Sequence, residues 1–567
     1  MSVTSGESKT LGGGVSSGGD ISSDSGVSSR IFREYDIRGV AGEELTPEVA
    51  RLVARAFAEW LDETGGPREG AGPGGAGLEG PGPGGAGQEA AGRVAERAPR
   101  VAIVGRDNRL SSPGLAEGVA RGLAEAGFEV IDLGIVPTPV FYWARVKHGL
   151  PPGVMVTGSH NEARYNGLKL AAGPATIYGE DIQEVGRRAR LLAVPSRAAR
   201  PPGAARPSAA GRAAAPATAR RPGATRPERG DLERRSGGGA VARPLEVLED
   251  YLADICERVA TGGAAGRRLR VAVDCGNGTA ALAAPELLRR LGYEVIPLFA
   301  ELDGNFPGHW PDPVVPENLT HLREAVRREK ADLGVAFDGD ADRLGVVDDQ
   351  GEILWGDMLM ILFWREILAR RPGVEALVEV KCSQGLVDEI RRLGGRPVFH
   401  RTGHSLIKAT MRRTGAPFAG EMSGHMFFAD EYYGFDDALY AAARLTRILA
   451  EAGKPLSELL ADRPRYFATP EVRVECPDEA KAAVVEAVRR RFARQGLEVI
   501  DVDGARVIFP GGAWLLVRAS NTQPALVVRC EARTAEELEQ VKAQVAEVLR
   551  ESQAEAGVPA GLTLPDW

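Results

Sequence analysis

The chain has 567 residues, of which 43% are hydrophobic and 26% are charged, and its formal net charge is -8 at pH 7. This composition is typical of a soluble globular protein with enough chain for several domains. The negative charge offers no global attraction to nucleic acid, and no unbroken apolar run approaches the length of a membrane span. We therefore expect a cytoplasmic protein that binds neither nucleic acid nor membrane.

Three low-complexity stretches are expected to lie outside the folded core. Residues 1–30 are rich in Ser and Gly and lack the basic and then apolar pattern of a secretory signal, so a disordered tail is predicted. Gly dominates residues 63–97, and Ala, Arg, Pro and Gly dominate residues 191–243. Both are predicted to be solvated insertions, although the basic second stretch could contact an acidic partner. The five cysteines are far apart without a C-x-x-C spacing, so neither disulfides nor a zinc site is expected.

Short apolar strands alternate with amphipathic helices along the remaining chain. In chain order, the predicted elements are strand 101–104, helix 112–126, strand 129–133, strand 153–156, strand 269–274, helix 284–291, strand 294–298, strand 333–337, strand 376–380, helix 386–393 and strand 397–400. This alternation predicts repeated α/β units with mixed or parallel sheets. After residue 465 the pattern changes to strand 471–475, helix 478–495, strands around Val507 and Leu515, and helix 534–554, which indicates a smaller α+β domain.

The first candidate site is the string T-G-S-H-N at residues 157–161, directly after the strand at 153–156. The hydroxyl of Ser159 stands at the end of a strand, beside side chains that donate hydrogen bonds. A serine in this position can react with an electrophile, and phosphate is the electrophile we expect. The alternative is a loop serine that forms a turn or caps a helix.

The second candidate site has three aspartates at alternate positions, Asp338, Asp340 and Asp342, after the strand at 333–337. Their carboxylates can converge on one hard cation, because the intervening residues are small. Three protein oxygens leave octahedral positions open, as expected for Mg²⁺ that also holds a phosphate oxygen. The spacing excludes an EF-hand and leaves a solvated acidic turn as the alternative. The adjacent Arg343 is a candidate clamp for the same phosphate.

Two further loops carry the polar groups that bind sugars and phosphates. The string G-E-M-S-G-H at residues 420–425 suits vicinal sugar hydroxyls, although a capped turn before an apolar strand accounts for it equally well. The string R-A-S-N-T-Q-P at residues 518–524, with Arg529 on the next strand, can cradle a phosphate, and the alternative is a polar turn with a surface arginine. Together the four strings indicate phosphoryl transfer on a phosphorylated polyol.

The order and wording of these strings resemble the α-D-phosphohexomutase superfamily, and the closest likeness is to its bacterial phosphomannomutase/phosphoglucomutase branch. Further matches occur at residues 32–39, 105–109, 165–169, 305–307, 311–313, 380–382 and 402–405. The resemblance implies a heart-shaped, four-domain protein with a central cleft, three similar α/β domains with mixed sheets and a C-terminal α+β domain. The expected domain bounds are 31–190, 244–352, 353–464 and 465–567.

The resemblance also implies a reaction and residue roles. Members interconvert hexose 6-phosphate and hexose 1-phosphate through a phosphoserine and a hexose 1,6-bisphosphate, so Mg²⁺ and this bisphosphate are the expected cofactors. The implied metal ligands are Ser159, Asp338, Asp340 and Asp342. The residues implied near the reacting groups are Ser159, His160, Lys169, His425 and Arg38, with His425 as a candidate acid or base. The implied substrate-binding residues are Tyr35, Arg343, Lys381, His404, Glu421, Ser423, Arg518, Ser520, Asn521, Thr522 and Arg529.

Two positions depart from the pattern of the superfamily. Glu162 stands where proline is common, which is expected to loosen the serine loop or to add charge near the phosphate. Arg401 stands where lysine is common, and since the two cations bind phosphate differently, the preferred sugar is expected to shift.

Three rival interpretations remain open. A mutase for glucosamine phosphate or pentose phosphate shares every chemical group, although Met422 favours mannose or glucose. A phosphohydrolase would need access for water, and a non-catalytic sugar-phosphate sensor should have lost Ser159 or an aspartate. In each case the expected partners are small sugar phosphates, and a monomer is the default.

Overall fold

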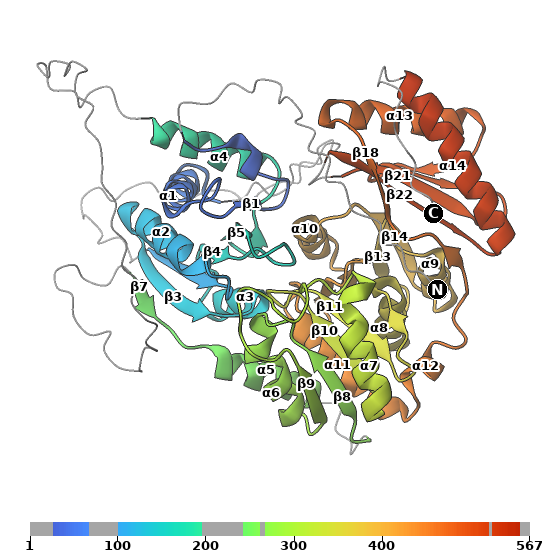
Figure 1. Ribbon diagram of the computed structural model, residues 1–567, viewed down its shortest axis with the longest axis horizontal. Coiled ribbons are helices and arrows are strands. Elements are labelled where there is room, and N and C mark those ends of the chain that lie inside the picture. Colours follow the sequence, from blue (N-terminus) through green and yellow to red (C-terminus); the bar gives the residue numbers. More distant parts are fainter. Residues whose placement is uncertain (1–25, 67–99, 195–241, 261–266, 521–523, 556–567) are drawn as a thin grey trace, which may run out of the picture.

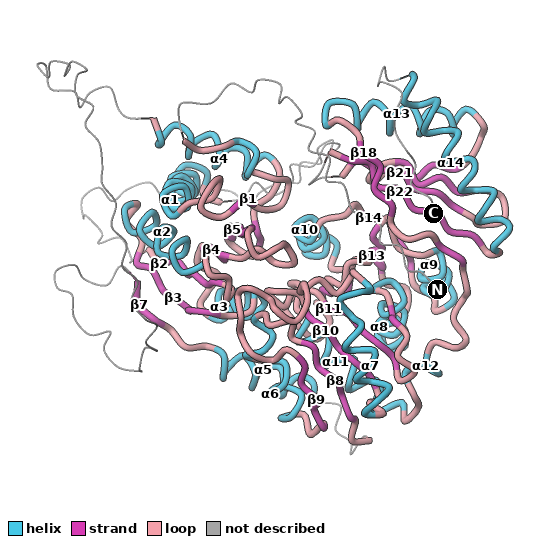
Figure 2. Tube along the Cα trace, in the orientation of Figure 1, coloured by secondary structure: helices cyan, strands magenta, loops and turns pink. Residues whose placement is uncertain are grey.

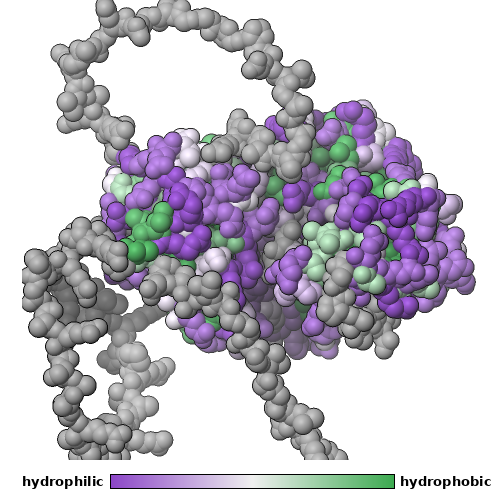
Figure 3. All heavy atoms as spheres, turned by 90° about the horizontal axis from the view of Figure 1, so that it is seen from above, coloured by the Kyte–Doolittle hydropathy of each residue, from purple (hydrophilic) through white to green (hydrophobic). Residues whose placement is uncertain are grey.

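The computed structural model describes residues 26–66, 100–194, 242–260, 267–520 and 524–555 (Figure 1). Within these residues the strands form four sheets, which follow one another along the chain and are arranged in an arc. Among the described helices, none combines the length and the apolarity that a membrane crossing requires. Hydrophilic residues cover most of the face seen from above (Figure 3).

The first sheet is mixed, with strand order β1-β5-β4-β2-β3-β7 and β6 paired to β5. Its strands are β1 (Ile37–Val40), β2 (Val101–Arg106), β3 (Glu129–Ile135), β4 (Gly153–Val156), β5 (Tyr165–Ala172), β6 (Ala175–Thr176) and β7 (Ala242–Pro244). Alternate residues of β2 enter two different cores, because successive side chains of a strand point to opposite faces. One face packs against α1 (Pro47–Thr64), α2 (Ser112–Glu125) and α4 (Glu180–Ala193), and the other against α3 (Thr138–Lys147).

The second sheet has the order β12-β11-β10-β8-β9 and the third has the order β14-β13-β15-β16. In each sheet three neighbouring strands run parallel, which are β9, β8 and β10 in the second sheet and β14, β13 and β15 in the third. The strands are β8 (Arg270–Asp274), β9 (Glu294–Leu298), β10 (Leu333–Phe337), β11 (Leu344–Asp348), β12 (Ile353–Leu354), β13 (Glu375–Glu379), β14 (Arg396–His400), β15 (Phe418–Gly420) and β16 (Met426–Phe428). The helices are α5 (Leu248–Ala260), α6 (Ala284–Arg290), α7 (Thr320–Glu329), α8 (Gly356–Arg370), α9 (Gln384–Arg392), α10 (His404–Thr414), α11 (Ala438–Ala452) and α12 (Leu456–Leu459).

The fourth sheet is antiparallel, with the order β17-β22-β21-β20-β19 and β18 paired to β22. Its strands are β17 (Phe467–Ala468), β18 (Val472–Glu475), β19 (Glu498–Ile500), β20 (Ala505–Ile508), β21 (Trp514–Ala519) and β22 (Ala525–Ala532). Figure 2 shows this sheet at one end of the molecule beside α13 (Asp478–Arg494) and α14 (Ala535–Glu555), whose apolar residues share its core.

A buried arginine attaches the fourth sheet to the third. Arg506 donates from Nη1 to the carbonyl oxygens of Val380 and Cys382, each at 2.7 Å. Its guanidinium lies 3.7 Å from the centre of the Trp514 ring, and Trp514 and Leu516 pack against Val380. The sheet face that is not covered by α13 and α14 is thereby buried against the neighbouring domain.

The predicted α/β class with a C-terminal α+β domain is confirmed. The predicted elements are present with small shifts at their ends: β2 and β3 continue to Arg106 and Ile135, and β18 begins at Val472. Much of the three low-complexity stretches lies outside the described residues. Where those stretches are described, α4 continues to Ala193, beyond the predicted boundary at residue 190.

Close packing of α1 on α2 depends on a glycine. A Cβ atom at Gly122 would lie 2.1 Å from the carbonyl oxygen of Arg51, whereas one at Gly114 in the same helix would be 3.5 Å from its nearest neighbour, in Pro47. We therefore expect Gly122→Ala to lower the stability of the protein by about 1–3 kcal/mol through overpacking, measured by urea denaturation. Gly114→Ala is the matched control and should be neutral or slightly stabilising; equal effects of the two changes would contradict this packing account.

Candidate active site

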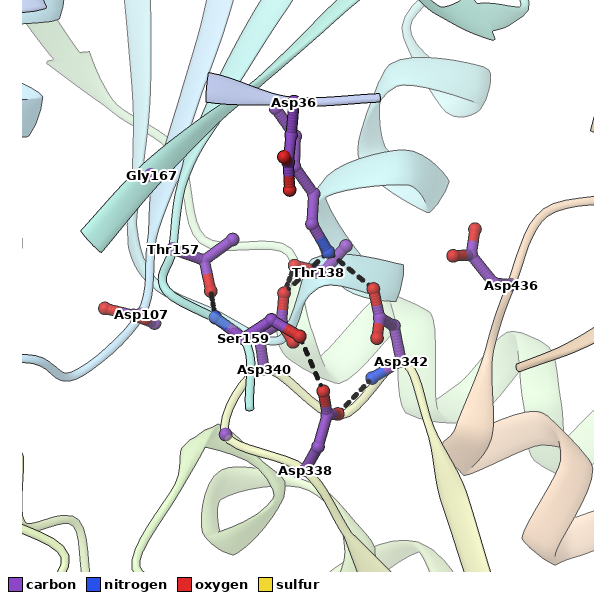
Figure 4. Close-up of polar contacts among 12 residues, drawn as sticks. Asp36, Asp107, Thr138, Thr157, Ser159, Gly167, Asp338, Asp340, Asp342 and Asp436 are labelled. Atoms are coloured by element: carbon purple, nitrogen blue, oxygen red, sulfur yellow. Dashed lines mark hydrogen bonds and ion pairs between the residues drawn. The ribbon is translucent and has the colours of Figure 1, made fainter. Parts of the chain in front are cut away.

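Ser159 lies in a buried loop that follows β4. Its side chain is 1% exposed, and its φ of 48° places a non-glycine residue in the left-handed region. Its backbone NH donates to Thr157 Oγ1 at 2.8 Å, and its Oγ donates to Asp338 Oδ2 at 2.8 Å (Figure 4). A strained conformation held in this way is characteristic of functional sites.

One arginine organises the whole serine loop. The side chain of Arg109 is fully buried, and its Nε donates to Asp107 Oδ2 at 3.1 Å. Its two terminal nitrogens donate to four carbonyl oxygens of the loop, at 2.5–3.1 Å, which belong to Ser159, Asn161, Glu162 and Tyr165. The other contact of Asp107 Oδ2 is the backbone NH of Gly158, at 3.0 Å. The planar guanidinium therefore fixes the backbone on both sides of the serine.

The three carboxylates among the predicted metal ligands come together after β10. Ligand oxygens of Asp338, Asp340 and Asp342 lie within 4.8 Å of one another, and all three residues are fully buried. Asp340 Oδ1 and Asp342 Oδ1 have no hydrogen-bond partner in the described structure. Buried carboxylate oxygens of this kind fit the oxygen-rich shell of a divalent cation, so the residues present suit a metal ion.

Lys169 on β5 supplies positive charge to this cluster. Its Nζ donates to Asp340 Oδ2 at 2.8 Å and to Asp342 Oδ2 at 2.5 Å. Burial alone would raise the pKa of Asp340, but the Lys169 ammonium outweighs it and holds this pKa below its ordinary value. Burial, with the charges of the other two aspartates, raises the pKa of Asp338 well above its ordinary value. Thr138 at the start of α3 also donates to Asp340 Oδ2, at 2.6 Å.

His425 lies beside the cluster of three aspartates, directly before β16. Its Nε2 accepts a hydrogen bond from Arg343 Nε at 3.0 Å, so the proton of a neutral ring is on Nδ1. Nδ1 lies 3.3 Å from Asp436 Oδ2 and 3.6 Å from Asp342 Oδ1. The His404 ring stacks on that of His425 at 5.5 Å, and Lys408 pairs with Asp436 at 2.8 Å.

The other residues predicted near the reacting groups flank the serine. His160 Nδ1 is 3.3 Å from Ser159 Oγ, and its backbone carbonyl accepts from Trp310 Nε1. Burial, with the charge of Arg343, lowers the pKa of His160 well below its ordinary value. Arg38 on β1 pairs with Asp36 at 2.6 Å, and its Nη1 is 3.5 Å from the carbonyl oxygen of Gly158.

The predicted sugar-binding loop connects β15 to β16. Glu421 is 3% exposed, and its Oε1 accepts from the backbone NH of Gly403 at 2.8 Å. Burial raises the pKa of its carboxyl group. Ser423 is partly buried in the same loop. Lys381, at the neighbouring end of β13, pairs with Glu471 at 3.0 Å.

Two of the predicted phosphate-binding residues, Arg518 and Arg529, lie on one face of the fourth sheet. Arg518 on β21 and Arg529 on β22 share that face, because Arg518 pairs with Val527 and Leu516 pairs with Arg529. Arg518 donates to Asp503 Oδ2 at 3.0 Å, and its Nη2 has no partner in the described structure. Arg529 contacts the Lys381 carbonyl oxygen and Met422 Sδ. Ser520 is buried, and Asn521 and Thr522 lie outside the described residues.

The two departures from the family pattern are accommodated by their neighbours. The Glu162 carboxylate is exposed and pairs with Arg164 at 2.8 Å, while its carbonyl oxygen accepts from Arg109. The loop is therefore held despite the missing proline, and the added charge has a counterion. Arg401 is partly exposed, with Nη2 at 4.0 Å from Glu34 Oε1.

Several residues of the site were not assigned a role from sequence. Arg109 and Asp107 belong to a matched motif, and two buried charges in one short loop could have marked them. Thr138 and Asp503 carry no comparable signal, because their contacts at the site lie between different sheets. Asp436 carries none either, although it reaches His425 within its own domain by pairing with Phe427 of β16.

Sequence profiles of four consecutive domains match this chain. They describe the alpha/beta/alpha domains I, II and III and the C-terminal domain of phosphoglucomutase/phosphomannomutase, at residues 86–190, 249–351, 355–467 and 471–548. A phosphomannomutase/phosphoglucomutase of Pseudomonas aeruginosa is 40% identical over 512 residues, which cover 90% of this chain and 94% of that protein. A phosphoglucomutase of Neisseria gonorrhoeae is 37% identical, over 91% of this chain and 96% of that protein.

A solved structure is similar to this one over most of its length. The crystal structure of a phosphoglucomutase/phosphomannomutase family protein from Burkholderia thailandensis is 35% identical, with a TM-score of 0.73, and the match covers 95% of this chain and 100% of that one. Fold, site and relatives together define a mutase enzyme of the phosphotransferase type. The chain belongs to the phosphoglucomutase/phosphomannomutase family.

Arg109 provides a test of how the serine loop is held. Lysine keeps the charge but cannot reach four carbonyl oxygens and a carboxylate at once, so we expect Arg109→Lys to lower kcat by roughly 10- to 100-fold. Arg106→Lys is the matched control, since Arg106 contacts only Asp132, at 3.3 Å, among the described side chains. Steady-state kinetics checks the difference, and equal kcat values for the two variants would refute the assigned role of Arg109.

Proposed function

We propose that this enzyme interconverts hexose 6-phosphate and hexose 1-phosphate, with mannose or glucose as the sugar, and that Ser159 carries the phosphoryl group. The observation that supports this most directly is the buried Ser159 hydroxyl, 2.8 Å from a carboxylate of the three-aspartate cluster. The names of the Pseudomonas and Neisseria relatives support the choice of sugar.

Mg²⁺ is the proposed cofactor, held by Asp338, Asp340, Asp342 and an oxygen on Ser159. When bound there, it neutralises charge on the phosphoryl group that is transferred. Lys169 and Arg343 add fixed positive charge beside the proposed metal position. Lys169 pairs with Asp340 and Asp342, and Arg343 contacts Asp338 and His425.

The sugar must bind in two orientations, because each of its two ends is phosphorylated in turn through a hexose 1,6-bisphosphate. We assign the hydroxyls that both orientations share to Glu421 and Ser423, with His404, Lys381 and Tyr35 lining the same path. The phosphate distant from the serine is assigned to Arg518, Ser520, Asn521 and Thr522, with Arg529 behind them. Nη2 of Arg518, which has no partner among the described residues, is suited to bind this phosphate.

Proton transfer is assigned to the imidazoles and their neighbours. A sugar hydroxyl that attacks phosphorus loses a proton, and the serine oxygen that leaves gains one. Burial lowers the pKa of His160, and of the imidazoles its Nδ1 has the hydrogen-bond contact with Ser159 Oγ, at 3.3 Å. His425 contacts Arg343 and Asp436 beside Asp342 of the three-aspartate cluster. Lys169 and Arg38 supply positive charge.

The first test removes the proposed phosphoryl carrier. We expect Ser159→Ala to lower kcat at least about 1,000-fold, since no other group accepts the phosphoryl group. Intact mass spectrometry should detect one phosphoryl group on the wild type and none on the variant. Ser457→Ala, which removes a hydroxyl bonded to Asp349, serves as the control. Full activity of Ser159→Ala would show that another residue carries the phosphoryl group.

Product analysis separates the proposal from its rivals. Wild-type enzyme with Mg²⁺ and a trace of hexose 1,6-bisphosphate is given mannose 1-phosphate, glucose 1-phosphate or glucosamine 1-phosphate. We expect the 6-phosphate of mannose or glucose as the product. Free inorganic phosphate would indicate a hydrolase, and a preference for glucosamine 1-phosphate would move the assignment to that mutase.

The metal assignment predicts opposite effects from two neighbouring residues. Asp340→Asn removes a ligand charge and should weaken Mg²⁺ binding at least about tenfold, whereas Lys169→Met removes a competing cation and should strengthen it by about the same factor. Isothermal titration calorimetry with Mg²⁺ measures both effects without any need for activity. Weaker binding in both variants would contradict the assignment of Lys169 as a charge that competes with the metal.

A further inference from the structure

Thr402 uses each of its three polar groups on a different part of the molecule. Its carbonyl oxygen accepts at 2.7 Å from the hydroxyl of Tyr35, which lies just before β1 in the domain of the first sheet. Its backbone NH donates to Asp503 Oδ2 at 3.0 Å, in the domain of the fourth sheet. Its Oγ1 donates to Glu379 Oε1 at 2.7 Å, at the end of β13 in its own domain. This single residue thus joins three of the four domains.

Glu379 extends the link to the sugar-binding loop. Glu379 is 1% exposed, and its second oxygen accepts from the backbone NH of Met422 at 3.0 Å. The buried Lys381 ammonium, 3.4 Å from Oε1, provides a counterion. Each oxygen of this buried carboxylate therefore holds a different loop, one at residue 402 and the other at residue 422.

Gly403, the residue after Thr402, is closely packed where the domains meet. Gly403 donates to Glu421 Oε1 at 2.8 Å, and a Cβ atom on Gly403 would lie 2.6 Å from the Tyr35 ring. Its φ of 135° is a conformation that favours glycine. The turn at 402–403 is therefore fixed against both the Tyr35 ring and the sugar-binding loop.

Asp503 carries the chain of hydrogen bonds to the phosphate-binding arginine. The Oδ2 atom that accepts from Thr402 also accepts from Arg518 Nε at 3.0 Å. The continuous path therefore runs from Met422 through Glu379, Thr402 and Asp503 to Arg518. It connects a loop of the third sheet to a strand of the fourth.

We infer that Glu379, Thr402 and Asp503 are positioning residues that set the separation between the sugar-binding loop and Arg518. The inference rests on the proposed function, in which one set of residues binds the sugar hydroxyls and another binds the distal phosphate. Both sets must fit a sugar bound in either orientation. A fixed separation between two recognition elements lowers the entropy that binding costs. Loss of the link should therefore weaken the binding of the whole sugar phosphate and leave the chemistry at Ser159 in place.

Substitutions in the middle of the path test the inference. Thr402→Val removes the hydroxyl and keeps the shape, and Glu379→Met removes both acceptors. In each variant we expect KM for glucose 1-phosphate and mannose 1-phosphate to rise about tenfold, while kcat changes less than about threefold. Thr402→Ser should restore KM to within about twofold of wild type, and so should Glu379→Gln, whose amide can donate to Thr402 and accept from Met422.

Inorganic phosphate separates the two ends of the path. Used as a competitive inhibitor, it should bind Thr402→Val as it binds the wild type, because Asp503 still holds Arg518. Asp503→Ala should raise both KM for the sugar phosphate and the inhibition constant for inorganic phosphate, each by about tenfold. The double variant Thr402→Val/Glu379→Met should be no worse than Glu379→Met alone, since Glu379→Met already removes the acceptor of the Thr402 hydroxyl.

Thr446→Val is the matched control, because it removes a buried hydroxyl within α11 of the same domain. The inference is overturned if Thr402→Val and Glu379→Met leave KM unchanged, if kcat falls instead of KM rising, or if their effects add. A melting temperature lowered equally in the valine and serine variants at residue 402, with KM following it, would also overturn it. A wild type without mutase turnover would contradict the proposed function itself, which keeps the two failures distinguishable.

Discussion

The site depends on the concentration of buried negative charge at the end of β10. Three fully buried carboxylates within reach of one another repel, and burial disfavours the charged form of each. They are stable because positive charge lies among them, from Lys169 and Arg343. The cation that we propose at this cluster would add to that charge. The requirement extends outward: Lys169 has to come from β5 of the first sheet, which fixes how the first two domains dock.

The serine loop meets the same requirement by different means. Its backbone has no helix or strand to satisfy its carbonyl oxygens, so a buried guanidinium does so, and Asp107 balances that charge. The carbonyl oxygens of the loop therefore have partners although the loop contains a serine in the left-handed region. Arginine is needed here for its geometry as much as for its charge.

Sequence predicted the fold class and the strand that precedes each functional loop, because hydrophobic periodicity reports local burial. It also predicted the aspartate cluster, since carboxylates at alternate positions of a short loop can turn toward one cation. It could not predict that Asp436 would stand beside His425, because that contact depends on how the segment after β16 folds back onto this strand. Nor could it predict that Thr402 would contact three domains, because those contacts depend on how separate sheets pack. The assignment of Arg529 to the phosphate site stays a prediction, and in the structure its Nη1 contacts the Lys381 carbonyl oxygen and Met422 Sδ.

The attachment of the fourth sheet has a consequence for how this enzyme can diverge. Arg506 and Arg529 bind the carbonyl oxygens of three consecutive residues, Val380, Lys381 and Cys382. The backbone oxygens accept these bonds whatever side chains the three residues carry. The side chain of Lys381, which faces the substrate path in our proposal, adds an ion pair to Glu471 of the fourth domain at 3.0 Å, and Val380 packs against Trp514 and Leu516. Exchange of the side chain at position 381 for a new sugar would therefore cost one ion pair across the interface and leave the bonds to the backbone in place.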